Sequence, residues 1–281
     1  MITTSIIVLF GLGLVAAIVL SVASVVLHVE EDPRIEAVSE VLPGANCGGC
    51  GYAGCDSYAK AVVENPDVPP DVCCAGGPDL AAKVAELTGK AAGGGMPKVS
   101  FRRCDKVGGK VEKKFGYQGV PSCSAAKMVQ NGPDACAYSC LGFGDCVRAC
   151  PFDAMYLKND MVEIIPEKCT ACGSCVNVCP NGILELIPMQ ARVQVFCSSG
   201  DKGKAVMDVC EVGCISCMKC VKKCPAEVIK MEDNRIYIDH EKCLEYGPSC
   251  EEICSEVCPR DILRRLKSHE QVEKELGGQA A

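Results

Sequence analysis

CTACGSCVNVCP, residues 169–180, carries four cysteines at the spacing C-x2-C-x2-C-x3-C, followed by proline. At this spacing three thiolates on a tight loop hold one 4Fe-4S cluster, while the fourth reaches a second cluster. The same spacing recurs in CISCMKCVKKCP, residues 214–225. Zinc sites typically pair two short cysteine knuckles across a longer gap and lack the final Cys-Pro, so both stretches predict iron-sulfur clusters.

Each of these motifs has a wider companion that also carries four cysteines and ends in Cys-Pro. CAYSCLGFGDCVRACP, residues 136–151, precedes the first, and residues 243–259 follow the second, with six residues between their first two cysteines. In two-cluster ferredoxins the fourth cysteine of each motif binds the other cluster. This crossing predicts four ligand sets: Cys136, Cys140 and Cys146 with Cys179; Cys169, Cys172 and Cys175 with Cys150; Cys214, Cys217 and Cys220 with Cys258; Cys243, Cys250 and Cys254 with Cys224. A degenerate motif without metal is the alternative for the two wide ones.

A further cysteine motif lies nearer the N-terminus, in NCGGCGYAGC at residues 46–55. Cys47, Cys50 and Cys55 are embedded in glycine, and Cys73 follows within a CCAGG segment. Glycine lets the backbone approach a cluster and point its N–H groups at the sulfides. These four cysteines predict a fifth 4Fe-4S site, for which a single zinc ion is the alternative.

The composition supports metal centres and argues against several other classes of function. The chain has 25 cysteines among 281 residues and no tryptophan, so clusters would form the hard centres of small domains whose folding depends on metal. A net charge of −7 argues against general nucleic-acid binding. No glycine-rich phosphate loop stands between a strand and a helix, and no acid-base pair stands out. We therefore expect no bound nucleotide and no catalytic residue, only electron transfer.

The first 29 residues are uncharged apart from the N-terminus and His28. About 25 residues in a helix would span roughly 37 Å, enough to cross a hydrocarbon core of about 30 Å. A cleaved signal peptide would have a positive start and a shorter apolar run, so we expect a single-pass membrane anchor. Reduced thiols and cluster insertion belong to the cytosol, so we expect the long C-terminal part on the cytoplasmic side of the inner membrane.

The motifs divide the chain into an α+β arrangement of small units. Helical patterns predict short helices over residues 35–42, 56–65 and 79–87, and strand patterns predict hairpins over residues 154–165 and 228–239. The expected order is a transmembrane helix (1–29), a small helical 4Fe-4S domain (35–90), a linker and basic segment (91–130), two tandem bacterial-type two-cluster ferredoxin domains (131–190 and 191–263), and a charged helical tail (264–281).

These residues, in this order, resemble the B subunit of Rnf complexes, which are membrane-bound, ion-translocating oxidoreductases that link ferredoxin to NAD. The resemblance covers residues 1 to about 263; it is carried by the uncharged first segment, LPGANCGGCGYAGCDSYAKAV with the later CCAGG, and the four Cys-Pro motifs. It implies an electron-relay subunit of a translocase, without a substrate-transforming site of its own. It also implies Cys73, not Cys74, as the fourth ligand of the small domain. Soluble ferredoxin and sister subunits are the implied partners, with flavin and NAD bound by the sister subunits.

Two other functions stay open at the level of the sequence. One is a membrane-bound structural scaffold that binds zinc or another metal, which would be colourless where an iron-sulfur protein is brown. The other is a self-sufficient reductase with its own substrate site. The anchor, the cluster motifs and the linker account for nearly every segment, which weakens the reductase hypothesis.

Five cysteines lie outside the expected ligand sets: Cys74, Cys104, Cys123, Cys197 and Cys210. Free buried thiols are the simplest interpretation of the last four. A sixth metal site held by those four, or a pair of disulfides, are the alternatives. An even set in a reducing compartment favours metal over disulfides.

Residues 98–127 carry an excess of positive charge within an acidic chain. Asp105 and Glu112 stand against eight basic residues, a net charge of +6: Lys98, Arg102, Arg103, Lys106, Lys110, Lys113, Lys114 and Lys127. Complementary charge raises association rates roughly 10- to 1000-fold at low salt. We expect this segment to dock an acidic soluble ferredoxin. A solvated face, or contact with anionic headgroups or a sister subunit, is the alternative.

Overall fold

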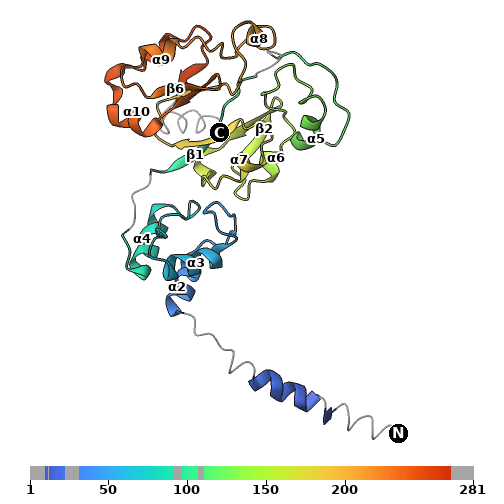
Figure 1. Cartoon of the computed structure of the whole chain (residues 1–281), viewed down its shortest axis with the longest axis vertical. Helices are drawn as coiled ribbons and strands as arrows, with labels where there is room; N and C mark the ends of the chain where they lie inside the picture. The colour runs from blue at the N-terminus through green and yellow to red at the C-terminus, as the bar shows by residue number, and fades with distance from the viewer. Residues whose placement is uncertain (1–9, 12, 23–31, 92–95, 107–110, 267–281) are drawn as a thin grey trace, which may run out of the picture.

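The computed structural model describes residues 10–11, 13–22, 32–91, 96–106 and 111–266. Figure 1 shows a small helical unit followed by a larger body that contains the remaining strands and helices. Residues 10–11 and 13–22 are helical and exposed. Within the described part of the chain, no helix combines the length and the apolar character that a membrane crossing needs. The rest of the anchor expected at residues 1–29 lies outside the described residues.

Three helices form the small unit: α2 (Pro33–Val41), α3 (Cys55–Glu64) and α4 (Gly77–Thr88). The side chain of Asp32 accepts a hydrogen bond from the amide of Arg34 and so caps α2, while Gly89 ends α4 in the left-handed region. Apolar side chains at helical spacing, among them the fully buried Val38 and Val62, meet in one core. The three helices expected from the sequence are therefore confirmed.

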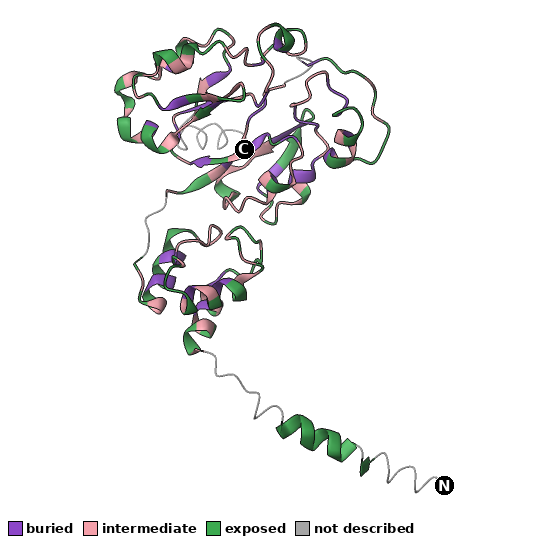
Figure 2. Ribbon diagram, viewed as in Figure 1, coloured by how far each residue is buried: buried purple, intermediate pink, exposed green. Residues whose placement is uncertain are grey.

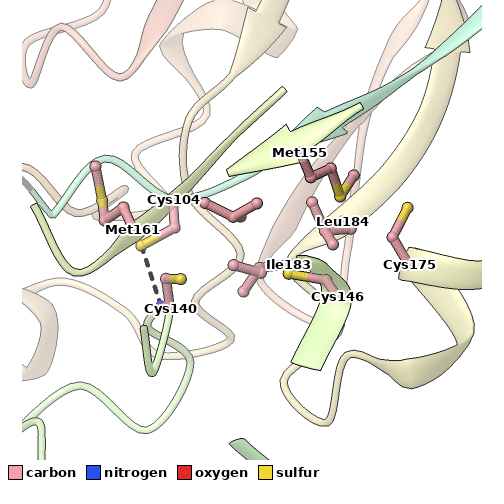
Figure 3. Packing of buried hydrophobic residues seen from close by; sticks show 9 residues of the cluster. Cys104, Cys140, Cys146, Met155, Met161, Cys175, Ile183 and Leu184 are labelled. Carbon is pink, nitrogen blue, oxygen red and sulfur yellow. Dashed lines mark hydrogen bonds between the residues drawn. The ribbon is translucent and has the colours of Figure 1, made fainter. Parts of the chain in front are cut away.

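The first ferredoxin unit contains β1 (Lys98–Arg102), α5 (Cys123–Met128), α6 (Asp145–Arg148), β2 (Met155–Lys158), β3 (Met161–Ile164), η1 (Pro166–Lys168), α7 (Ser174–Val178) and β4 (Leu184–Pro188). β1 pairs antiparallel with β4, and β2 pairs with β3 as a hairpin. Asn159 and Asp160 form the hairpin turn and both have positive φ, as a two-residue type I′ turn requires. Figure 3 shows the core, where Met155 and Leu184 pack among buried cysteines.

The second ferredoxin unit contains β5 (Val193–Val195), α8 (Lys204–Met207), α9 (Lys219–Lys223), β6 (Ile229–Glu232), β7 (Arg235–Ile238), α10 (His240–Tyr246), η2 (Pro248–Cys250), α11 (Ile253–Glu256) and β8 (Leu263–Arg265). β5 pairs antiparallel with β8, and β6 pairs with β7 as a hairpin. Its core joins Val193, Ile229 and Leu263 to the buried Cys243 and Cys254. Both expected hairpins are thus confirmed, one in each unit.

The two units repeat one architecture, in which the first and last strands pair and an inner hairpin lies between them in the sequence. Figure 2 shows buried residues concentrated in these strands and in the helices of the small unit. Two expected boundaries differ. Part of the expected linker forms β1, because its residues pair with β4. The start of the expected helical tail forms β8, because it pairs with β5; residues 267–281 lie outside the described residues.

The basic segment at residues 98–127 does not present its central cations to solvent. The side chains of Arg102, Arg103 and Lys106 are at most 11% exposed. They form ion pairs with three carboxylates, those of Glu163, Glu185 and Asp134 respectively. The expectation that these three cations form a docking surface is therefore wrong, because packing of β1 and the following loop places them inside the protein.

Candidate metal centres

The second ferredoxin unit holds two cavities, each lined by four cysteines. One cavity, of about 390 Å³, is lined by Cys214, Cys217, Cys220 and Cys258. The other, of about 360 Å³, is lined by Cys224, Cys243, Cys250 and Cys254. Each cavity thus receives three cysteines from one motif and the Cys-Pro cysteine of the other, which is the arrangement that crossing predicts.

The wide gap after Cys243 does not pull its cysteines apart. The inserted residues continue α10 and then form η2, so Cys243 and Cys250 line the same cavity. Arg192 donates to the carbonyl oxygen of Cys243 at 2.7 Å and to its Sγ at 3.5 Å. Burial raises the pKa of Cys243, while the hydrogen bond from Arg192 lowers it. The guanidinium therefore favours the thiolate form that binds metal.

The first ferredoxin unit has one such cavity, of about 380 Å³, and its cysteines differ from the expected set. Cys140, Cys146 and Cys179 line it as expected, but the fourth cysteine in its lining is Cys123, not Cys136. Cys123 is the first residue of α5 and is buried. No spacing signal marks this position, because 16 residues separate Cys123 from the next cysteine used, Cys140.

Asp145 fixes Cys123 at this cavity. Its carboxylate accepts hydrogen bonds from the amides of Cys123 and Ser124, both at 3.0 Å, and from the hydroxyl of Ser122 at 2.9 Å. The N-cap residue of α5 makes no side-chain cap of its own, so Asp145 caps this helix from a distance. Burial acts to raise the pKa of Asp145, but these hydrogen bonds outweigh it and lower the pKa.

Replacing Asp145 by alanine is expected to destabilise the first unit by about 2 kcal/mol or more, because several charge-assisted hydrogen bonds are lost. At about 4–8 °C per kcal/mol for a unit of this size, the melting temperature of the anaerobic holoprotein should fall by roughly 8 °C or more. Since the pKa is lowered in the folded state, this contribution is present above the ordinary Asp pKa and is lost as pH falls through the folded pKa. Asp208→Ala, at an exposed carboxylate, is the control; equal melting temperatures for the two variants would contradict the role of Asp145.

Two of the remaining cysteines of the first unit, Cys169 and Cys175, contact Ser100 of β1. Its amide donates to the Sγ of Cys169 at 3.4 Å, and its hydroxyl lies 3.3 Å from the Sγ of Cys175. Burial raises the pKa of Cys175, and the neighbouring Cys169 and Cys172 thiols raise it further. Cys150, the Cys-Pro cysteine expected to complete this set, accepts a hydrogen bond from the amide four residues later. Cys258 in the second unit accepts the equivalent bond, so the two Cys-Pro cysteines share one local geometry.

In the small unit, five cysteines line a cavity of about 340 Å³: Cys47, Cys50, Cys55, Cys73 and Cys74. The backbone turns with positive φ at Gly48 and Gly51, which only glycine adopts readily. This loop touches the first ferredoxin unit, because a side chain on Gly49 would come within 2.5 Å of the Cys172 carbonyl oxygen. The cavity of the small unit therefore lies beside the loop that carries Cys169, Cys172 and Cys175.

The number of thiols around each cavity indicates what kind of metal group it fits. Four cysteines line each of the three cavities in the ferredoxin units, and five line the cavity of the small unit. A 4Fe-4S cluster, which is a multi-atom group held by four cysteine thiolates, fits this arrangement.

Family comparisons agree with this chemistry. Residues 42–74 match the family model described as a putative Fe-S cluster, and residues 128–180 and 213–262 each match a 4Fe-4S dicluster domain. The fold and the cysteine-lined cavities define an iron-sulfur protein of the electron-transfer class, built from one small Fe-S domain and two dicluster ferredoxin domains.

Curated relatives identify the family. The B subunit of the proton-translocating ferredoxin:NAD(+) oxidoreductase complex of Clostridium ljungdahlii is 40% identical over 96% of this chain and 94% of its own length. The B subunit of the ion-translocating oxidoreductase complex of Methanosarcina acetivorans is 40% identical over 92% and 96%. The Na(+)-translocating counterpart of Acetobacterium woodii is 39% identical over 89% of this chain and 74% of its own length. The chain belongs to this family of B subunits, and the resemblance noted from the sequence is confirmed.

Proposed function

We propose that this chain relays single electrons between a soluble ferredoxin and the sister subunits of a membrane-bound, ion-translocating oxidoreductase. The observation that carries the proposal is the set of cavities lined by four cysteines in crossed arrangement, in a chain that belongs to the B-subunit family. A 4Fe-4S cluster, when bound, takes up and releases one electron. The residues of this chain hold the clusters, exclude water from them and set their potentials through hydrogen bonds to the cysteine sulfurs.

The proposal assigns at least five 4Fe-4S clusters to 20 cysteines. Four sets follow the crossing described above, with Cys123 in place of Cys136, and the fifth is Cys47, Cys50, Cys55 and Cys73. Anaerobic reconstitution should give about 20 or more iron atoms and as many sulfides per chain, with the corresponding EPR signals after reduction. Iron near 8 per chain, or zinc in stoichiometric amount, would contradict this function.

The proposal also keeps the single-pass anchor at residues 1–29 and the cytoplasmic location of the cluster domains. Its support is the uncharged sequence of that segment and the number of cysteines at cluster spacing, whose thiols bind iron only in the reduced state. A protease added to right-side-out vesicles should leave residues 35–266 intact, and the same protease added to inverted vesicles should digest them. The opposite pattern would reverse the orientation.

We place the docking surface for ferredoxin at α9. Among the 25 cysteines, all of which the structure describes, Cys217 alone is exposed. The neighbouring Lys219, Lys222 and Lys223 are exposed as well. A partner that rests here would come near a cluster ligand at the surface, and an acidic partner would be attracted by the three lysines.

Reversing these charges tests the docking surface. Lys219→Glu, Lys222→Glu and Lys223→Glu together should slow reduction of the clusters by reduced ferredoxin roughly 10-fold or more at low salt, and flatten its salt dependence. Stopped-flow absorbance measures this rate. The matched control reverses Lys98, Lys113 and Lys114, three exposed lysines of the basic segment, and should keep the wild-type rate. If the control slows and the α9 variant does not, ferredoxin docks on the basic segment.

A further inference from the structure

Four cysteines that none of the five ligand sets uses come together between the two ferredoxin units: Cys104, Cys136, Cys197 and Cys210. Cys197 and Cys136 lie on adjacent segments, because the hydroxyl of Ser198 donates to the carbonyl oxygen of Tyr138 at 3.1 Å. The Cys136 thiol interacts with the thiols of both Cys197 and Cys210. Cys104 follows β1 and is buried, and its thiol interacts with that of Cys197. Segments from both units thus supply thiols to one location.

The backbone around these four cysteines makes the same local contact as the backbone around the cysteines that line the cavities. In each of the four, the thiol accepts a hydrogen bond from the amide two residues later: Lys106 for Cys104, Tyr138 for Cys136, Ser199 for Cys197 and Val212 for Cys210. The same contact is made to Cys140 by Gly142 and to Cys214 by Ser216 in the cavities already described. Amide donors stabilise a thiolate, and they are the contacts that tune an iron-sulfur cluster.

Cys104 is buried, and Cys136, Cys197 and Cys210 are partly buried. A thiolate in such surroundings is unstable without a positive partner. Four amide-bonded thiols that repel one another as thiolates are stabilised together when a metal group binds among them.

We propose that Cys104, Cys136, Cys197 and Cys210 hold a sixth 4Fe-4S cluster between the two ferredoxin units. The set has the four cysteines that such a cluster requires, and each thiol has an amide donor. It differs from the sixth site considered from the sequence, because Cys123 and Cys136 exchange places: Cys123 lines the first-unit cavity, and Cys136 faces the junction.

The position of this sixth site gives it a role in connecting the units. The amide of Cys140, a cavity cysteine of the first unit, donates to the Sγ of Cys104 at 3.4 Å (Figure 3). The amide of Cys214, a cavity cysteine of the second unit, donates to the Sγ of Cys197 at 3.4 Å. The site is therefore one hydrogen bond away from a ligand residue in each unit, and it joins the two sets of clusters into one series.

Iron and sulfide analysis of double cysteine variants tests the assignment. Replacing two ligands of the same cluster removes one cluster, whereas replacing one ligand in each of two clusters removes both. Cys197→Ala with Cys210→Ala should lower iron by about four atoms per chain, and Cys136→Ala with Cys197→Ala should lower it by the same amount. Cys123→Ala with Cys197→Ala, which removes ligands of two clusters, should lower it by about eight. The wild type should approach about 24 iron atoms.

Each other outcome overturns the proposal. If the Cys197 and Cys210 double variant keeps the wild-type iron content, these thiols hold no cluster. If it loses one metal atom per chain instead of four, they hold a single metal ion. Loss of about eight from the Cys136 and Cys197 pair, with four from the Cys123 and Cys197 pair, returns Cys136 to the first-unit cavity. Because the other five clusters remain in the Cys197 and Cys210 variant, failure here leaves the proposed relay function standing and is distinguishable from its failure.

Discussion

Removal of iron from the purified chain is expected to unfold both ferredoxin units. Their buried clusters of side chains contain no aromatic residue, and cysteines make up four of the nine members in the first unit and two of the eight in the second. Without clusters, the twelve cysteines that line the three cavities of these units would have no metal to join them. Because cluster binding contributes free energy to folding, and domains are usually stable by only about 5–15 kcal/mol, loss of the clusters is expected to leave both units unfolded.

Anaerobic chelation followed by circular dichroism measures this result. The strand signal and the cooperative melting transition should both disappear, and reconstitution with iron and sulfide should restore them. The small unit should lose less helix, because α2, α3 and α4 share an apolar core around Val38, Val62 and Val84. The same incubation without chelator is the control. An iron-free protein that melts cooperatively, with the strand content of the holoprotein, would contradict the dependence of the fold on metal.

The repeat and the cysteine linings of the two cavities in the second unit could be predicted from the sequence, because short-range spacing determines them. In a C-x2-C-x2-C loop the chain has little freedom, so Cys214, Cys217 and Cys220 meet at one cavity whatever surrounds them. The hairpins follow equally from local signals, since Asn159–Asp160 and Asp233–Asn234 suit the positive φ of two-residue turns. The fourth cysteine of each motif then reaches the cavity of the other motif once the two motifs lie in one unit.

The position of Cys123 in the lining of the first-unit cavity could not be predicted, because long-range contacts determine it. Cys136 has the shorter separation from Cys140, but its segment runs along residues 197–200, where Ser198 binds the Tyr138 carbonyl. Cys123 reaches the cavity through the hydrogen bonds from α5 to Asp145, 22 residues later. The prediction that Arg102 and Arg103 form part of a docking surface was wrong for a similar reason. The net charge of a segment does not show that β1 pairs with β4 and that these two side chains are buried.

Lys106, a residue of the basic segment, forms a buried ion pair. Its ammonium forms an ion pair with Asp134, and the two side chains are 11% and 3% exposed. Asp134 also accepts a hydrogen bond from the hydroxyl of Ser139 at 2.7 Å. The pair ties the loop after Cys104 to the segment before Cys136, two of the cysteines that we assign to the sixth cluster. A buried carboxylate that loses its cation keeps the cost of desolvation without the compensating attraction.

Replacing Lys106 by methionine, which has a similar stem and no charge, is therefore expected to destabilise the protein by about 3–5 kcal/mol. At about 4–8 °C per kcal/mol for units of this size, the melting temperature of the anaerobic holoprotein should fall by roughly 12 °C or more. Adding Asp134→Asn to this variant removes the unpaired charge and should recover part of the loss. Lys113→Met is the matched control, because Lys113 is an exposed lysine of the same segment and its replacement should cost less than about 0.5 kcal/mol. Equal melting temperatures for the Lys106 and Lys113 variants would mean that the buried pair contributes no net stability.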